Sequence, residues 1–170
     1  MSPGTNLVLR PPRVEDAPAL AAEANDPAVW AGLRDYFPQP YTVDDALRFI
    51  EVVLERAGPQ LHWFLEVDGQ AAGVMSVFPG EDVYRYNAEL GYWLGQRHWG
   101  RGIMTEAIRQ TVAYCWRELT VTRLYAEVFS TNIGSRRVLE KCGFAEEFTL
   151  PNVVVKLGER CDMTSLGLRR

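Results

Sequence analysis

The sequence has few cysteines and histidines, which limits the metal and disulfide chemistry that it can support. Only three cysteines and two histidines occur among 170 residues. Cys115, Cys142 and Cys161 are widely spaced and form no Cys-x-x-Cys pair, so neither a disulfide framework nor a zinc site is predicted. We therefore expect no metal. The cysteine usage fits the reducing cytoplasm, which is the location that we expect.

The sequence also lacks long apolar runs and an excess of positive charge. No run of about eighteen apolar residues occurs, and the first residues do not show the basic-then-apolar pattern of a signal peptide. Neither a membrane span nor secretion is expected. The formal net charge of −4 argues against direct nucleic-acid binding, which needs a basic face.

What remains is the composition of a globular protein. Apolar residues make up 47% of the chain and charged residues 24%, which argues against disorder. A chain of 170 residues can bury a core without disulfides or metals. We predict one domain that covers residues 1–170, either as a monomer or as a homodimer.

Hydrophobic periodicity and turn residues divide the chain into helices and strands. Strands are predicted at Leu7–Arg10, Trp63–Val67, Ala71–Phe78, Ala88–Leu94, Leu124–Phe129, from Phe144 onward, and at Cys161–Leu168. Helices are predicted at Val14–Leu20, Asp26–Leu33, Thr42 to near Gly58, Ile103–Leu119 and Asn132–Cys142. Asp68-Gly69 predicts a hairpin turn between the second and third strands. The order predicts an α/β (α+β) fold with a mixed, mostly antiparallel sheet flanked by helices.

A glycine-containing loop, Arg97-His98-Trp99-Gly100-Arg101-Gly102, joins a predicted strand to a predicted helix. The start of a helix presents unpaired backbone N–H groups and the positive end of the helix dipole. Glycines let the main chain close around an anion. The pattern therefore favours phosphate binding, although an ordinary strand-to-helix connection can have the same glycines.

Asn132 and Ser135 lie one helical turn apart, directly after another predicted strand. Their side chains can face the same cleft at the carboxyl edge of the sheet, where α/β proteins place ligands. Asn132 can also simply cap the helix, and the two roles are compatible.

Together, Arg97-x-x-Gly100-x-Gly102 and Asn132-x-x-Ser135-x-x-x-Leu139-x-Lys141-x-Gly143-Phe144 resemble the GNAT superfamily of acyl-CoA-dependent N-acyltransferases. Leu90-Gly91-Tyr92-Trp93-Leu94 and Thr105-Glu106-Ala107 are similar to the branch that acetylates the amino termini of ribosomal proteins. The resemblance covers nearly the whole chain. It implies a sheet whose two central strands splay apart, acetyl-CoA as co-substrate, and direct attack of a primary amine, foremost a protein or peptide N-terminal amine, in a ternary complex.

The resemblance also implies which residues hold the coenzyme. Backbone amides from the glycine loop and the helix start would face the diphosphate, and the arginines would add charge. The preceding strand would pair with pantetheine, Asn132 would bind the same arm, and Arg137 or Lys141 would reach the adenosine phosphates. The implied coenzyme site consists of Tyr92, Trp93, Leu94, Arg97, His98, Trp99, Gly100, Arg101, Gly102, Ile103, Met104, Asn132, Ser135, Arg137 and Lys141.

Two residues are candidates for proton transfer. Glu89 is a carboxylate among apolar neighbours in a predicted strand, so partial burial would tune it as a general base that acts through water. Strand alternation could instead turn Glu89 to solvent. Members of the family often have a tyrosine acid in the helix after Asn132, but this helix has none. Ser135 takes that place, with helix capping or solvent exposure as the alternative.

An aromatic loop with several prolines precedes the third helix and is expected to be irregular. The aromatic residues of this loop and the earlier Trp30 could pack in the core. Alternatively, they could form the wall of an acceptor site, which would consist of Trp30, Tyr36, Phe37, Tyr41 and Glu89. The alternatives for the function are a small-molecule amine acetyltransferase and a non-catalytic acyl-CoA-binding sensor. No serine-hydrolase or Walker motif is present.

Overall fold

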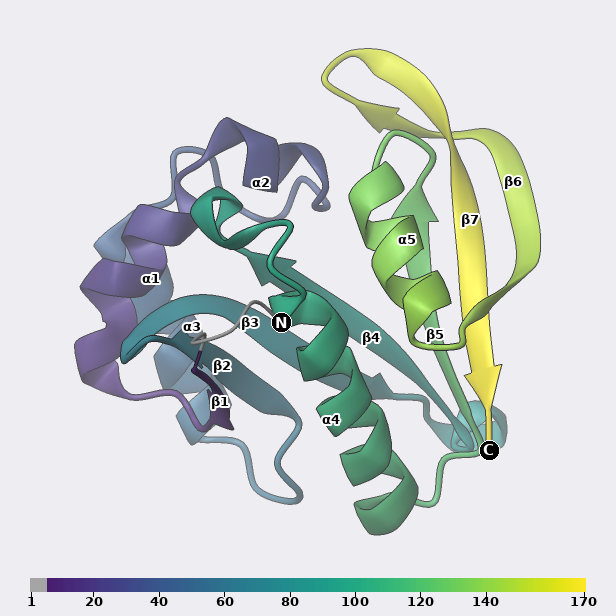
Figure 1. Ribbon diagram of the computed structural model, residues 1–170, viewed down its shortest axis with the longest axis horizontal. Coiled ribbons are helices and arrows are strands. Elements are labelled where there is room, and N and C mark those ends of the chain that lie inside the picture. The colour runs from purple at the N-terminus through teal and green to yellow at the C-terminus, as the bar shows by residue number, and fades with distance from the viewer. Residues whose placement is uncertain (1–5) are drawn as a thin grey trace. The chain divides into compact units, whose positions relative to one another are not determined.

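The computed structural model, drawn as a ribbon in Figure 1, describes residues 6–170. These residues divide into two compact units. Of the described residues, the first unit comprises 6–76 together with Tyr92–Ala107. The second comprises Val77–Gly91 and Ile108–Arg170. Three elements, β3 (Gln70–Pro79), β4 (Asn87–Leu94) and α4 (Ile103–Glu118), continue from one unit into the other.

The first unit contains an antiparallel hairpin and the strand that pairs with it. β2 (His62–Val67) pairs with β3, and β1 (Leu7–Arg10) pairs with β2 from Leu7↔Val67 to Arg10↔Phe64. Asp68 and Gly69 both have positive φ, 51° and 88°, as a two-residue type I′ turn requires. The predicted hairpin and its turn are therefore confirmed.

Helices of the first unit cover an apolar core. η1 (Val14–Asp16), α1 (Ala17–Ala24), α2 (Pro27–Ala31) and α3 (Val43–Leu54) follow β1 in sequence, and α1 packs against α3. Leu20, Ile50 and Phe64 are fully buried in this core. α2 ends two residues before the predicted Leu33 because Gly32 takes its C-cap position. α3 ends at Leu54 because the residues between it and Gly58 bury no side chain.

A buried ion-pair cluster ties the first strand to the helices. Both terminal nitrogens of Arg10 lie 2.7 Å from the two carboxylate oxygens of Asp16, and Arg10 also pairs with Glu66 of β2. Burial alone would raise the pKa of Asp16, but hydrogen bonds from Arg10 and from the Arg13 backbone outweigh it and lower the pKa.

The second unit contains the carboxy-terminal strands and α5 (Ile133–Lys141). β4 pairs in parallel with β5 (Arg123–Phe129), and β5 pairs in antiparallel with β7 (Glu159–Arg169). β7 also forms the long hairpin in Figure 1 with β6 (Ala145–Lys156). A short turn of helix, η2 (Asp82–Tyr84), precedes β4. In residues 6–170, hydrogen bonding connects seven strands in the order β1-β2-β3-β4-β5-β7-β6, which confirms the predicted mixed sheet.

α4 buries one face, as its periodicity predicts. Ile103, Ala107, Ile108 and Cys115 are essentially inaccessible to solvent. Burial raises the pKa of the Cys115 thiol to about 12, so this cysteine is an inert core residue.

Candidate active site

The glycine loop lies between the end of β4 and the start of α4, within the first unit. Gly95 donates its N–H to the carbonyl oxygen of Ala72 at 2.8 Å, and η3 (Gln96–His98) follows. Gly100 and Gly102 have φ values of 73° and 77°. In this left-handed conformation a residue with a side chain would be strained, whereas glycine is not. A Cβ atom on Gly100 would meet no atom within 4 Å, so the space beside it is open.

Helical hydrogen bonding in α4 begins from Glu106 N to Gly102 O, at 3.1 Å. The N–H groups of the residues between these two belong to the first turn of the helix, where no intrahelical acceptor precedes them. Together with the dipole of a 16-residue helix, this turn has the properties of an anion-binding site.

The charged side chains of the loop are held by carboxylates from elsewhere in the first unit. Arg97 forms an ion pair with Glu23 of α1, and Arg101 lies 3.2 Å from the Oδ2 atom of Asp68 in the β2–β3 turn. A hydrogen bond from the Asn6 backbone and another from Arg101 lower the pKa of Asp68. The two arginines could be identified from the sequence, but their carboxylate partners could not.

His98, which we placed in the glycine loop and in the implied coenzyme site, is buried, with 7% of its surface exposed. Its Nε2 atom lies 3.2 Å from Oε1 of Glu23. Glu23 was not among the site residues predicted from the sequence. The available signal was a single carboxylate among the apolar residues of α1, where Leu20, Ala21 and Ala24 are buried.

Several residues of the implied coenzyme site have buried side chains. The side chains of Trp93, Leu94, Ile103 and Met104 are buried, while Tyr92 is half-buried. These positions can offer a ligand their backbone rather than their side chains. Trp99 differs, because its indole is 48% exposed and its Nε1–H donates to the carbonyl oxygen of Leu94 at 2.7 Å.

The aromatic residues proposed for an acceptor wall divide into two groups. Phe37 stacks on Tyr41 with ring centroids 4.7 Å apart and meets the edge of Trp93 at 5.8 Å, while Trp30 Nε1 donates to the Phe37 carbonyl. Burial raises the pKa of Tyr41 to about 12, with a contribution from the charge of Asp45. Three of the aromatics therefore pack together, whereas Tyr36 is 79% exposed.

The two candidate proton-transfer residues lie in the second unit. Glu89 is half-buried on β4, opposite Tyr125 of β5, while its neighbours Ala88 and Leu90 turn into the core on the other face. The parallel register of β4 and β5 runs from Asn87↔Arg123 to Glu89↔Tyr125. Glu89 is thus at the last of these paired positions, in a partly buried setting.

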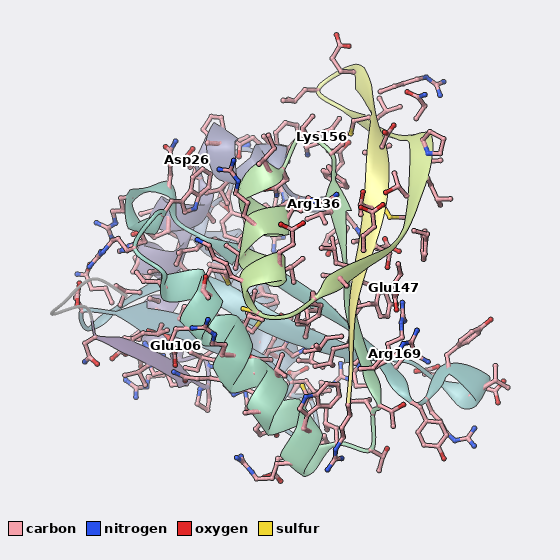
Figure 2. All side chains as sticks on the ribbon, turned by 45° about the vertical axis from the view of Figure 1, so that its right-hand side comes forward. Asp26, Glu106, Arg136, Glu147, Lys156 and Arg169 are labelled. Carbon is pink, nitrogen blue, oxygen red and sulfur yellow. The ribbon has the colours of Figure 1, made fainter. Side chains whose placement is uncertain are left out.

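Asn132 caps α5. Its Oδ1 atom accepts a hydrogen bond from Ser135 N at 3.1 Å, which confirms the capping role. Ser135 is half-buried in the first turn, and Arg137 and Lys141 are exposed. The neighbouring Arg136 pairs with Glu140 and Glu146, and Figure 2 shows it on α5 with Glu147 and Arg169 on the β6–β7 hairpin.

Within residues 6–170, no cluster of three or more histidine, cysteine, aspartate or glutamate side chains is arranged to bind a metal ion. No helix in this part of the chain is long and apolar enough to span a membrane.

Comparison with known proteins gives the family. Residues 6–145 match the family model described as an acetyltransferase (GNAT) domain. The probable N-acetyltransferase YjcK of Bacillus subtilis is 34% identical over 160 residues, with 86% of this chain and 84% of YjcK covered. The putative ribosomal N-acetyltransferase YdaF of the same organism is 38% identical over 80 residues, 47% of this chain and 43% of YdaF.

Solved structures share the fold of this chain. The crystal structure of Mycobacterium smegmatis RimJ in complex with CoA-disulfide has a TM-score of 0.82 and 23% identity, with 96% of this chain and 81% of RimJ covered. Both the extent of the family match and the identity to YjcK show that this chain belongs to the GNAT family of N-acetyltransferases.

Proposed function

We propose that the protein transfers the acetyl group of acetyl-CoA to the N-terminal amine of a protein or peptide. The observation that carries the proposal is the glycine loop, with Gly100 and Gly102 in left-handed conformations directly before α4. The names of YdaF, a putative ribosomal N-acetyltransferase, and RimJ, in complex with CoA-disulfide, support the acceptor class and the coenzyme.

The coenzyme diphosphate would lie against the backbone amides of residues 97–104. Open space beside Gly100 gives an oxygen atom access to the main chain, and the start of α4 adds its dipole. The backbone of Tyr92–Leu94 would pair with the amide groups of pantetheine in the manner of an added strand. Asn132, Arg137 and Lys141 remain proposed contacts to the rest of the coenzyme.

The chemistry requires a neutral amine, attack on the thioester carbonyl and protonation of the departing thiolate. The amine nitrogen bonds to the acetyl carbon, the carbon–sulfur bond breaks, and the sulfur takes up a proton. An N-terminal amine with a pKa of about 7.7–8.0 needs only a weak base, a role that Glu89 would fill through a water molecule. Ser135 would donate a hydrogen bond to the sulfur. Holding the amine and the thioester in a reactive geometry would lower the activation free energy by about 7–11 kcal/mol.

Coenzyme binding can be tested by thermal shift. CoA at about 100 times its Kd should stabilise the wild type by roughly 2.7 kcal/mol. Replacing Gly100 and Gly102 together by valine should abolish the shift and leave the far-ultraviolet circular dichroism unchanged. Gly58→Val is the matched control, because Gly58 also has a positive φ, 112°, with no atom within 4 Å of a Cβ. An undiminished shift in the double variant would exclude the loop as the diphosphate site.

Turnover can be measured by thiol release and by mass spectrometry of a panel of peptides and small amines. Glu89→Gln and Ser135→Ala should each reduce kcat by about 100-fold with a smaller effect on CoA affinity. Unchanged rates would remove both residues from the mechanism. Preference for small amines would assign the protein to small-molecule acetylation, and CoA binding without turnover on the panel would indicate a sensor.

A further inference from the structure

Glu23 is an unusual residue for the interior of α1. Only 7% of its surface is exposed, and the neighbouring Ala21 and Ala24 are buried as well. A carboxylate in such surroundings loses its hydration, so it is tolerated only with hydrogen-bonding or charged partners.

The partners of Glu23 come from the glycine loop. Its Oε1 atom pairs with the Arg97 guanidinium and lies 3.2 Å from His98 Nε2. Its Oε2 atom occupies the place where a side chain on Gly95 would begin, because a Cβ atom there would lie only 1.9 Å away. The loop backbone therefore rests directly on this carboxylate.

His98 connects the carboxylate to the other arginine of the loop. Its Nδ1 atom lies 3.3 Å from a terminal nitrogen of Arg101, which can only donate. The Glu23 carboxylate can only accept hydrogen bonds and the arginines can only donate them, so the ring lies between an acceptor and donors. Arg97 Nε donates toward the Nε2 atom at 3.1 Å, so Arg97 and Glu23 share this nitrogen and both arginines contact one ring.

We propose that Glu23 is a positioning residue for coenzyme binding: through His98 and Arg97 it fixes the loop conformation that receives the diphosphate. This inference rests on the proposed function. The Glu23 carboxylate places a negative charge next to the proposed diphosphate site, and this makes the two possible effects of Glu23 distinguishable. Its electrostatic field alone would oppose the binding of a diphosphate, so the carboxylate is useful there only through the geometry that it imposes.

The two effects predict opposite results for Glu23→Gln. If Glu23 positions the loop, the Kd for CoA, measured by calorimetry on the folded variant, should rise about tenfold, as expected for loss of a hydrogen bond to a charged group. If only its field matters, binding should tighten. If it serves stability alone, Tm should fall at unchanged Kd. Either of the last two results would overturn the inference. Glu55→Gln, an exposed position at the end of α3, makes the same charge change as a control.

A second variant covers the case in which Glu23→Gln does not fold. Gly95→Ala keeps the charge but places a methyl group where the carboxylate lies, and its φ of −53° suits alanine. It should weaken CoA binding by a similar factor, with KM for acetyl-CoA rising more than kcat falls. Wild-type affinity in this variant would contradict the positioning role.

A double-mutant cycle tests the route through His98. Because Glu23→Gln and His98→Gln break the same contact, the double variant should bind CoA about as weakly as either single variant. Additive losses would overturn the proposed connection. Absence of CoA binding by the wild type would overturn the proposed function and this inference with it, whereas wild-type binding that Glu23→Gln and Gly95→Ala leave intact would overturn the inference alone.

Discussion

At the scale of single residues, two glycines differ in the space that is available for a side chain. A Cβ atom on Gly73 of β3 would lie 2.3 Å from the Trp93 carbonyl oxygen and 2.9 Å from the Leu94 Cα, both backbone atoms. On Gly134, in the first turn of α5, the nearest atom would be 3.9 Å away. The same substitution should therefore have opposite effects at the two positions.

Gly73→Ala should lower the free energy of unfolding by about 1–3 kcal/mol, because the β4 backbone must move. Gly134→Ala should raise it by about 0.5–1 kcal/mol, because alanine loses less backbone entropy in a helix. Urea unfolding followed by circular dichroism measures both. A stabilising Gly73→Ala would mean that β4 has room beside β3.

His62 should make stability depend on pH. Burial, and secondly the positive charge of Arg56, lower the pKa of His62 from its ordinary 6.5. The unfolded chain then binds a proton more readily than the folded one, so the stabilisation is complete above about pH 7 and is lost as pH falls through 6.5. The free energy of unfolding should fall between pH 7.5 and 5.5, and less so in His62→Gln. Equal pH dependence in both proteins would remove His62 as the cause.

At the scale of elements, local capping explains why most helices could be located from the sequence. Asp26 accepts a hydrogen bond from Ala28 N at the start of α2, and Asn132 caps α5 in the same way. Thr42 and Asp45 exchange hydrogen bonds of 2.9 and 3.2 Å at the start of α3. Each signal lies within a few residues of the helix that it begins, which is why the sequence alone reveals it.

The capping box can be tested directly. Thr42→Ala removes the acceptor for Asp45 N and should lower the free energy of unfolding by about 1 kcal/mol. Thr42→Ser keeps the hydroxyl group and should have a smaller effect. Chemical unfolding of the two variants gives the comparison, and equal losses would show that the threonine methyl group, rather than the cap, is responsible.

Long-range pairing could not be predicted in the same way. The sequence indicated that two strands follow α5 but not that β7 enters between β5 and β6. The contact of Glu23 with His98 spans 75 residues, and no local pattern encodes it. Of the candidate site, the sequence could therefore predict the main-chain loop and the cap, but not the carboxylates that hold the loop.

At the scale of the whole molecule, three elements pass without interruption between the two compact units. Because β3, β4 and α4 cannot lose half their length without fraying the other half, we expect one cooperative transition, which the predicted single domain also requires. Scanning calorimetry should give equal calorimetric and van't Hoff enthalpies. Two resolved transitions would show that the units unfold separately.

The ion pairs of the glycine loop have a consequence for how a ligand arrives. Arg97 and Arg101 each face a carboxylate, so the loop projects little excess positive potential into the surrounding solution. Polyanions such as heparin should therefore be retained poorly, and the association rate of CoA should change little with ionic strength. CoA would then reach the loop by diffusion without electrostatic steering. The loop would discriminate among ligands by how well a diphosphate fits its main-chain amides.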